Sequence, residues 1–501
     1  MQFEVTTNTL GSISSDVVVI FAFEEKKGYI LSKTVHDLPK KLQKQIDDQL
    51  ALQQFTGKES EIEFVFTGNI ILAPRVCVVG LGKKDDVTGH TLRKALARVA
   101  KAINKSVNSL SIGLIDQVKI DSELQSQAML EGAEMGMYQF ANYKKKDPAD
   151  KKLELITVSA PEKTLHTKIS RGLATGHAYF LATKMARDLV NEQAAVATPT
   201  LLAKVGEEIA NQNPQITCTV YDREQLIEMG AFAFLGIAQG ADIPPKFIVL
   251  NYTPKEVKQN KTIALVGKGI TFDTGGVNVK PDGYMTTMKQ DMAGGAAVLG
   301  VFSALNVVKP SFRVLGIIAA TSNVISGRSI VPGDVVRAMN GKSIEVLHTD
   351  AEGRVTLADS LSYAVKQKAT EIIDIATLTG ACVVGLGSDI AGLMGNDQDL
   401  KENLKKAADV TGEKVWELPL PDEYRELNKS EVADVSNLPS SRYGGAITAG
   451  LFLQEFVDDT PWVHIDIAGP AFAEKEYLFG QKGGTGFGVR LLLQYLRSSK
   501  S

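Results

Sequence analysis

The chain has 501 residues, 44% of them hydrophobic and 23% charged, a composition typical of a globular protein too long for a single hydrophobic core. Its formal net charge of −3 gives no electrostatic sign of nucleic-acid or membrane binding. The three cysteines are scattered and form no CxxC pair, so the sequence indicates neither a disulfide framework nor a thiolate zinc site.

Three features favour a cytoplasmic location. The N-terminal residues 1–5 include an acid and lack the basic region and long apolar run of a secretory signal. No apolar stretch is long enough to cross a bilayer, so we expect no membrane attachment. The sparse cysteines fit a reducing compartment.

The first part of the chain alternates apolar runs with amphipathic patterns. Residues 17–21 and 75–80 have the composition of strands, and residues 91–103 and 126–143 have the periodicity of helices. This alternation predicts an α/β domain.

A lysine-rich segment, residues 144–152, interrupts that alternation, and we interpret it as a solvated surface loop. A helical pattern runs from about residue 168 to 189. We therefore predict a smaller N-terminal α/β domain over residues 1–167 and a larger C-terminal domain over residues 168–501.

The second part has stronger strand signals, separated by helical stretches at residues 293–305 and 355–368. The short, β-branched-rich runs are residues 246–251, 262–266, 313–319, 371–375 and 463–467. Apolar runs of this kind predict a mixed sheet buried on both faces. The second domain is therefore also α/β.

Several glycine-rich stretches do not fit the motifs they suggest. A P-loop needs Ser or Thr after its lysine, but Gly269 follows Lys268, and Asp85 stands where a dinucleotide fingerprint needs its third glycine. No histidine begins an HExxH motif, and no serine lies in a GxSxG motif. The sequence thus shows neither a thermolysin-like site nor a serine-hydrolase nucleophile.

Four acids remain as candidates. We expect Asp273 to follow the strand at 262–266 after a short turn, and Asp350 and Glu352 to point to one side of an extended segment before a helix that starts after Arg354. Asp291 precedes a helical pattern, where an N-cap is the simpler interpretation. Taken singly, each acid is more often a cap or a surface charge than a ligand.

Convergence of these acids would need positive charge, and two divalent cations would supply it. Carboxylate ligands fit zinc, manganese, cobalt or magnesium and do not choose among them. Lys268 could also bind a metal, but only as a neutral amine whose pKa is lowered by burial and a nearby dication.

Together the motifs resemble the leucyl (cytosol) aminopeptidase family, whose enzymes use two metal ions. The stretches that carry the resemblance are residues 266–276, 288–297 and 349–354, together with residues 187–192, 376–381, 446–450 and 485–490. They cover essentially the whole second domain. The first domain resembles the family's variable, macrodomain-like N-terminal domain only in its α/β character.

This resemblance implies a set of site residues. The metal ligands would be Lys268, Asp273, Asp291, Asp350 and Glu352, with Asp273 and Glu352 bridging the two ions. Lys280 and Arg354 would be catalytic without binding metal. In the family, Arg354 anchors a bicarbonate ion that acts as general base, and Lys280 polarises the scissile carbonyl.

The same resemblance places Met288, Thr377, Leu378, Gly380 and Ala449 or its neighbours in the pocket for the first side chain. A methionine would give that pocket an adaptable wall suited to leucine, although a helical methionine is more often ordinary core. The chain departs from many family members at one position, where His348 replaces an asparagine. We interpret His348 as a neutral imidazole that stands in for an amide.

The leading hypothesis is therefore a metal-dependent aminopeptidase that acts on peptides with a free N-terminus and prefers leucine. The resemblance also implies a homohexamer. The expected metal ions are Mn²⁺ or Zn²⁺, and Co²⁺ or Mg²⁺ are further candidates. A second hypothesis is a DNA-binding regulator with a secondary peptidase role or none, since some bacterial members of the family bind DNA. The near-neutral charge gives this alternative no support. A third makes the first domain an independent ligand-binding module.

Overall fold

The computed structural model describes residues 1–103, 107–145, 153–257 and 260–499. The chain forms two compact units: unit 1 contains Met1–Phe180 and Lys475–Gln481, and unit 2 contains Leu181–Glu474 and Lys482–Ser501. Both are α/β, as predicted. Of the loop predicted at residues 144–152, Lys144 and Lys145 are exposed, and residues 146–152 lie outside the described part.

Unit 1 is built on a seven-stranded sheet with the order β1-β7-β6-β2-β5-β4, and β3 pairs with β2. Its strands are β1 (Gln2–Thr6), β2 (Val17–Glu25), β3 (Gly28–Leu31), β4 (Ile62–Phe66), β5 (Arg75–Gly80), β6 (Ser109–Gly113) and β7 (Leu155–Ser159). The central strands run parallel, and β3 and β4 are antiparallel to their neighbours.

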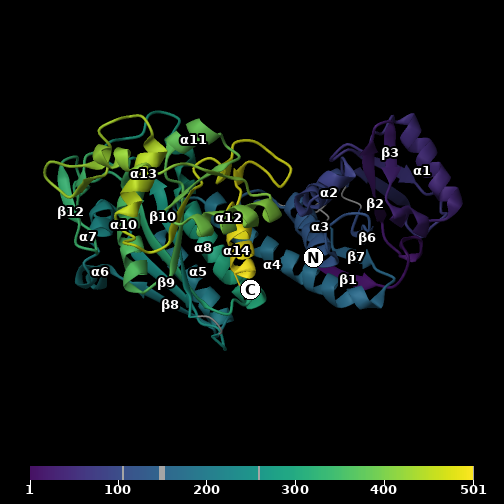
Figure 1. Ribbon diagram of the computed structural model, residues 1–501, viewed down its shortest axis with the longest axis horizontal. Helices are drawn as coiled ribbons and strands as arrows, with labels where there is room; N and C mark the ends of the chain where they lie inside the picture. Colours follow the sequence, from purple (N-terminus) through teal and green to yellow (C-terminus); the bar gives the residue numbers. More distant parts are fainter. Residues whose placement is uncertain (104–106, 146–152, 258–259, 500–501) are drawn as a thin grey trace. The chain divides into compact units, whose positions relative to one another are not determined.

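Alternating side chains of β2 explain why helices cover both faces of this sheet. Val17 and Val19 pack in the core with α2 (Gly89–Ala102) and α3 (Ser122–Gly136), whereas Val18 and Ile20 pack with α1 (Lys40–Leu52). Successive side chains of a strand point to opposite faces, so a run of buried apolar residues needs a helix on each side. Figure 1 shows α2 and α3 side by side near β6.

The predicted strands at 17–21 and 75–80 are confirmed, but one helix was predicted wrongly at both ends. α3 begins at Ser122 and ends at Gly136, not at residues 126 and 143. It begins earlier because the Asp121 side chain accepts a hydrogen bond from the Leu124 N–H and caps the helix. The helix predicted from residue 168 to 189 is confirmed as α4 (His166–Asn191). The domain boundary at residues 167/168 falls at its start and stays a prediction.

Unit 2 is built on an eight-stranded mixed sheet with the order β16-β15-β18-β14-β10-β11-β9-β8. Its strands are β8 (Ile216–Tyr221), β9 (Lys246–Tyr252), β10 (Thr262–Asp273), β11 (Arg313–Asn323), β14 (Glu371–Ala376), β15 (Ala391–Gly395), β16 (Val415–Glu417) and β18 (Trp462–Asp466). β10, β11, β14 and β18 are parallel where they pair, and β8, β9 and β15 supply the antiparallel pairs. The predicted mixed sheet is confirmed.

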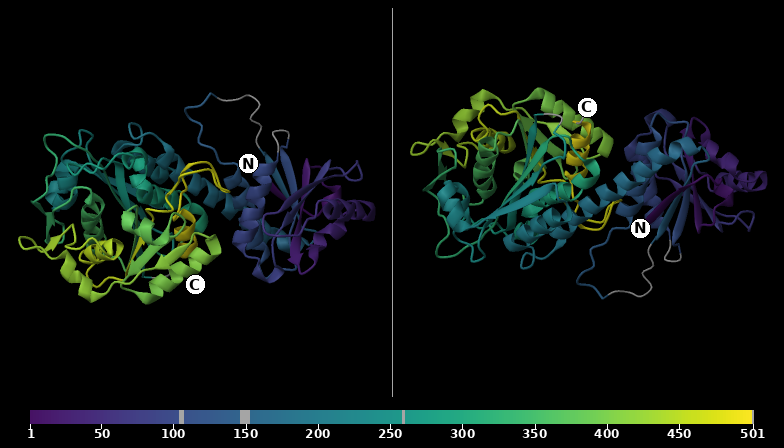
Figure 2. Two further views of the ribbon diagram at one scale, coloured as in Figure 1. Left: turned by 90° about the horizontal axis from the view of Figure 1, so that it is seen from above. Right: turned by 90° about the horizontal axis from the view of Figure 1, so that it is seen from below.

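Helices cover both faces of this sheet (Figure 2). On one face, α7 (Phe232–Ala238), α10 (Glu352–Lys366) and α13 (Gly445–Gln454) share a buried core with the sheet. α5 (Pro199–Gln212), α8 (Ala293–Ser303), α12 (Gln398–Thr411) and α14 (Val489–Ser498) complete the layers, together with the short helices α6 (Arg223–Met229), α9 (Leu305–Val308) and α11 (Gly380–Leu386). Two small sheets, of β12 (Asp334–Arg337), β13 (Ser343–Val346) and β17 (Val435–Ser436) and of β19 (Phe472–Ala473) and β20 (Gly483–Gly484), lie outside the main sheet.

Glycines let α8 approach the sheet closely. A Cβ atom on Gly267 would lie 2.6 Å from the carbonyl oxygen of Gly294, and one on Gly294 would lie 2.0 Å from that of Ile375. Any larger residue would push the helix away from β10 and β14. This contact matters for the site because α8 directly follows the segment that carries Asp291. Within the described residues, no helix is both long and apolar enough to span a membrane.

Candidate active site

β10 contributes the first two residues of the site, Lys268 and Asp273. The strand extends to Asp273, so this residue ends the strand and does not follow it after a turn as predicted. An odd spacing of five would place the two side chains on opposite faces of a regular strand. The register with β11 shifts between Ile270 and Asp273, and such an irregularity can turn a side chain to the other face. Lys268 and Asp273 consequently face the same cluster.

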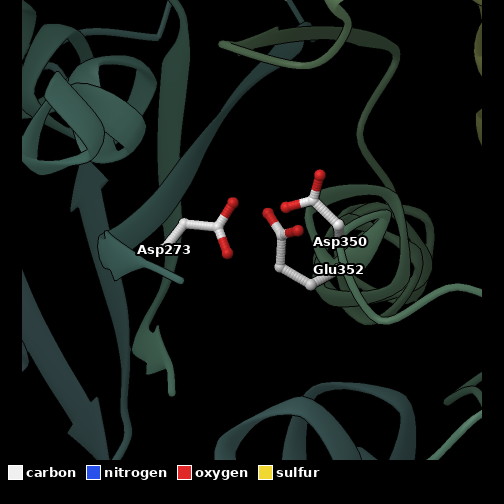
Figure 3. A group of neighbouring side chains, drawn as sticks. All are labelled: Asp273, Asp350 and Glu352. Carbon is white, nitrogen blue, oxygen red and sulfur yellow. The ribbon is translucent and has the colours of Figure 1, made fainter. Parts of the chain in front are cut away.

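Asp350 and Glu352 approach Asp273 from the opposite side (Figure 3). Carboxylate oxygens of these three residues lie within 4.8 Å of one another. The prediction that Asp350 and Glu352 lie in one extended segment is wrong, because α10 begins at Glu352 and not after Arg354. Glu352 is therefore the first residue of the helix, where the helix dipole favours a negative charge. Asp350 lies in the loop that joins β13 to this helix.

Asp291 lies in the 3₁₀ helix η5 (Met285–Met292) and does not act as an N-cap. Met292 occupies the N-cap position of α8, and no side chain caps that helix. Instead, Asp291 Oδ1 accepts a hydrogen bond from Thr377 Oγ1 at 2.8 Å and lies 2.8 Å from Lys268 Nζ. The structure thus brings Asp291 into the cluster.

Two lysines neutralise part of the negative charge. Lys268, only 4% exposed, places Nζ 2.9 Å from Glu352 Oε1 and donates a hydrogen bond to the Thr377 carbonyl at 2.9 Å. Lys280 Nζ lies 2.7 Å from Asp273 Oδ2 and 2.5 Å from Asp350 Oδ1. Burial lowers the pKa of each lysine, but the neighbouring carboxylates outweigh it and raise both pKa values. A divalent cation would act in the opposite direction and favour the neutral amine that Lys268 needs as a ligand.

The acids respond to the same crowding. Burial, and next the charge of Asp273, raises the pKa of Glu352 and of Asp350. Burial also raises the pKa of Asp291, against the opposing pull of Lys268. The two lysines alone therefore do not fully neutralise these carboxylates in their ionised forms.

The free oxygen atoms of the cluster fit divalent cations. Among the described residues, buried Glu352 Oε2 and Asp291 Oδ2 have no hydrogen-bond partner. Asp273 Oδ1 accepts hydrogen bonds from the Gly275 N–H and from Asn323 Nδ2, each at 2.8 Å, whereas its Oδ2 lies 2.7 Å from Lys280 Nζ. Buried carboxylate oxygens without donors are costly unless a cation binds them.

Arg354 lies on the first turn of α10 and is largely buried. Its Nη1 donates a hydrogen bond to the Asn437 carbonyl at 3.0 Å, whereas its buried Nε has no partner in the described part of the chain. Burial, partly offset by Glu352 and Asp466, lowers the pKa of Arg354 to about 10, so the guanidinium stays charged at neutral pH. An unpaired donor on a buried cation fits a small anion.

The predicted pocket residues have different surroundings. Met288 and Leu378 are half-buried, Gly380 is exposed at the start of α11, and Ala449 is buried in α13. Thr377 contacts both Asp291 and Lys268, so it orients two ligand candidates. The pocket assignment of these residues stays a prediction.

His348 is half-buried, and its Nδ1 accepts a hydrogen bond from the Asp350 N–H at 3.3 Å. Burial, and next the charges of Arg354 and Lys280, lowers the pKa of His348. This arrangement agrees with the interpretation of His348 as a neutral imidazole that replaces an amide.

Two asparagines of the site were missed in the sequence. Asn323 Nδ2 donates hydrogen bonds to Asp273 Oδ1 and to the Thr349 carbonyl, at 2.8 and 2.9 Å. It pairs with Asp273 across β10 and β11, and the rule that the carboxyl ends of neighbouring parallel strands meet could have identified it. Asn437 contacts the loop before α10, and no motif marks it because it lies far away in the sequence.

Comparison with known proteins identifies the relatives of this chain. The profile of the cytosol aminopeptidase family, catalytic domain, matches residues 184–493, and that of the family's N-terminal domain matches residues 17–147. A probable cytosol aminopeptidase of Alkaliphilus oremlandii is 39% identical over 99% of both chains, and one of Aquifex aeolicus is 45% identical over 90% of both. The solved structure of the bottromycin maturation enzyme BotP in complex with Mn is 32% identical, has a TM-score of 0.85 and covers 97% of this chain and 100% of that one. The chain therefore belongs to the cytosol aminopeptidase family of metal-dependent peptidases.

Proposed function

We propose that this chain is a dinuclear-metal aminopeptidase that removes N-terminal residues, leucine by preference, from peptides with a free N-terminus. The observation that supports it best is the buried cluster of four carboxylates and two lysines, in which Glu352 Oε2 and Asp291 Oδ2 have no partner among the described residues. Such a cluster has little structural value by itself because it costs desolvation without full pairing. It is suited to holding cations.

In this proposal Lys268, Asp273, Asp291, Asp350 and Glu352 would hold the two ions, and the family resemblance implies that Asp273 and Glu352 would be shared between them. When bound, the ions would lower the pKa of a water molecule and withdraw electron density from the scissile carbonyl. The residues around them orient the ligands: Asn323 fixes the Asp273 carboxylate, and Thr377 fixes that of Asp291. Hydrogen bonds of this kind commonly set metal affinity.

In this proposal Lys280 and Arg354 are catalytic residues that do not bind metal. Lys280 carries an ammonium group within 2.7 Å of Asp273 and can turn its donors toward a developing oxyanion once cations neutralise the carboxylates. Arg354 presents its unpaired Nε–H to an anion, which the family resemblance implies to be bicarbonate acting as general base.

Manganese is the first metal to test, because the BotP structure contains Mn. Zn²⁺ fits the same oxygen ligands, and Co²⁺ or Mg²⁺ are further candidates. Hexameric assembly, a cytoplasmic location and the pocket formed by Met288, Thr377, Leu378 and Gly380 belong to the same proposal.

The test is hydrolysis of leucine p-nitroanilide by the full chain, before and after chelation and with each metal added back. The proposal expects activity that is lost on chelation and restored by Mn²⁺ or Zn²⁺, with leucine faster than alanine or glutamate p-nitroanilide. A folded protein that hydrolyses no aminoacyl anilide or dipeptide with any of these metals would contradict it.

A further inference from the structure

We propose that Asn437 is a positioning residue for both the proposed metal site and the proposed anion site: its side-chain amide fixes the loop that carries Asp350, and its backbone carbonyl fixes Arg354. This inference rests on the proposed function. Its test measures metal binding directly, so it can fail separately from the peptidase activity.

The side chain of Asn437 binds the loop that carries Asp350. Oδ1 accepts hydrogen bonds from the N–H groups of Leu347 and His348, at 2.8 and 3.2 Å. Nδ2 donates to the carbonyls of His348 and Ala351, at 2.8 and 3.4 Å. The residues bonded in this way lie on both sides of Asp350 in the sequence, so these bonds fix the loop before and after it.

The backbone of the same residue reaches Arg354. The Asn437 carbonyl accepts the hydrogen bond from Arg354 Nη1, and the Asn437 N–H donates to the Glu345 carbonyl at 3.0 Å. β17 ends one residue earlier and is paired with β13. Asn437 is thus fixed to the small sheet on one side and holds the loop and the guanidinium on the other.

The chemistry of this position requires an amide. Asn437 is 0% exposed, and all the groups it binds with its side chain are backbone groups of one loop. Only Asn and Gln offer a carbonyl oxygen and an NH₂ group together, and Gln is one methylene longer than this fully buried site accommodates. Asp keeps the shape and the acceptors but loses the two donors.

A merely structural role would lower stability without moving metal affinity. Asn428 is a matched control, because it is also buried in unit 2 and donates one hydrogen bond from its side chain to a backbone carbonyl, that of Thr448, at 2.8 Å. It contacts no ligand candidate through any hydrogen bond that the described residues show.

The experiment compares wild type, Asn437→Ala, Asn437→Asp and Asn428→Ala as full chains. Mn²⁺ binding is titrated by calorimetry on metal-free protein, folding is checked by circular dichroism, and kcat and KM are measured with leucine p-nitroanilide at saturating Mn²⁺. We expect Asn437→Ala to weaken Mn²⁺ binding by about 10–100-fold and to lower kcat with little change in KM, because outer partners of ligands typically act on this scale. Asn437→Asp should shift both quantities in the same direction by less.

Asn428→Ala should bind Mn²⁺ and turn over substrate as wild type does. The inference is overturned if a folded Asn437 variant binds Mn²⁺ within twofold of wild type, or if Asn428→Ala weakens binding equally. If Asn437→Ala does not fold, Asn437→Asp decides by the same criteria. If wild type binds Mn²⁺ but hydrolyses no peptide substrate, the proposed function fails, and the Mn²⁺ titrations still test Asn437.

Discussion

Two buried acids on α10 have opposite surroundings. Glu352 opens the helix with Oε2 unpaired among the described residues, whereas Asp359, two turns later, accepts hydrogen bonds from the N–H groups of Phe234 and Met339 at 2.8 and 2.7 Å. Unit 1 offers a second fully paired acid, Glu131, which receives Arg93 Nε at 2.6 Å and Gln127 Nε2 at 2.8 Å. Burial alone therefore does not mark a site. One unpaired oxygen does not mark a site either, because buried Glu134 in unit 1 has an Oε2 without a hydrogen-bond partner among the described residues, while its Oε1 pairs with His177. What distinguishes Glu352 is that its carboxylate also lies within 4.8 Å of those of Asp273 and Asp350.

The largest expected effect comes from replacing Glu352, the acid with an unpaired oxygen. Glu352→Ala should lower turnover on the order of 10³-fold, since under the proposed function it removes a metal ligand and the charge stabilisation that depends on it. Metal-free stability should fall by less than in Glu131→Ala, because Lys268 loses its contact with Glu352 but keeps its ion pair with Asp291, and the repulsion between Glu352 and Asp273 is removed. Anilide hydrolysis and denaturant unfolding of the chelated protein measure the two quantities. Retained activity with a full metal complement would contradict the assignment.

Glu131→Ala tests the opposite case, a buried acid whose oxygens are both paired. It breaks the buried ion pair in which Arg93 Nε lies 2.6 Å from Glu131 Oε2, and breaking a buried ion pair by removing one partner costs about 3–5 kcal/mol. Urea unfolding should show this loss, while the Mn²⁺ affinity of the folded variant stays at the wild-type value. A variant as stable as wild type would show that the pair contributes nothing to the fold.

Lys280→Ala and Arg354→Ala separate chemistry from metal binding. Each should lower kcat by roughly 10²-fold, the scale of one transition-state donor, and leave the metal content largely intact. Steady-state kinetics with metal analysis by mass spectrometry checks both. If either substitution abolishes metal binding, its residue acts as a ligand or holds one, and the assigned role is wrong.

The smallest effect concerns the pH dependence of stability. Burial, against the hydrogen bonds from Phe234 and Met339, raises the pKa of Asp359 to about 7. The folded state then keeps a proton that the unfolded state releases near pH 4, so the free energy of unfolding falls as pH rises from about 4 to about 7. Relative to Asp359→Asn, wild type should lose at most about 1.4 kcal/mol per pH unit within this window. Parallel curves for both proteins would contradict the shift.

Much of this architecture could be predicted from the sequence, because it depends on local pattern. The β-branched runs at β9, β11, β14 and β18 are strands within one or two residues at their starts, and the motif at residues 349–354 marks Asp350 and Glu352. Such segments carry their own periodicity, and their burial on both faces follows from it.

The details that align the site could not be predicted in this way. The register shift in β10 turns Asp273 toward Lys268, and α10 begins at Glu352 because of its tertiary setting, without a capping side chain. Asn437 contributes through hydrogen bonds to backbone groups of a loop far away in the sequence, a contact that leaves no periodic signal. Long-range pairing of single residues is therefore the part that only the structure supplies.

The most direct test of the central claim is the number of metal ions that the metal-free chain binds. Equilibrium dialysis against Mn²⁺, read by mass spectrometry, should give two ions per wild-type chain, and Glu352→Ala should lose at least one of them while Glu131→Ala keeps both. Stoichiometry that is unchanged in Glu352→Ala, or no bound metal in wild type, would show that the unpaired carboxylates serve another purpose.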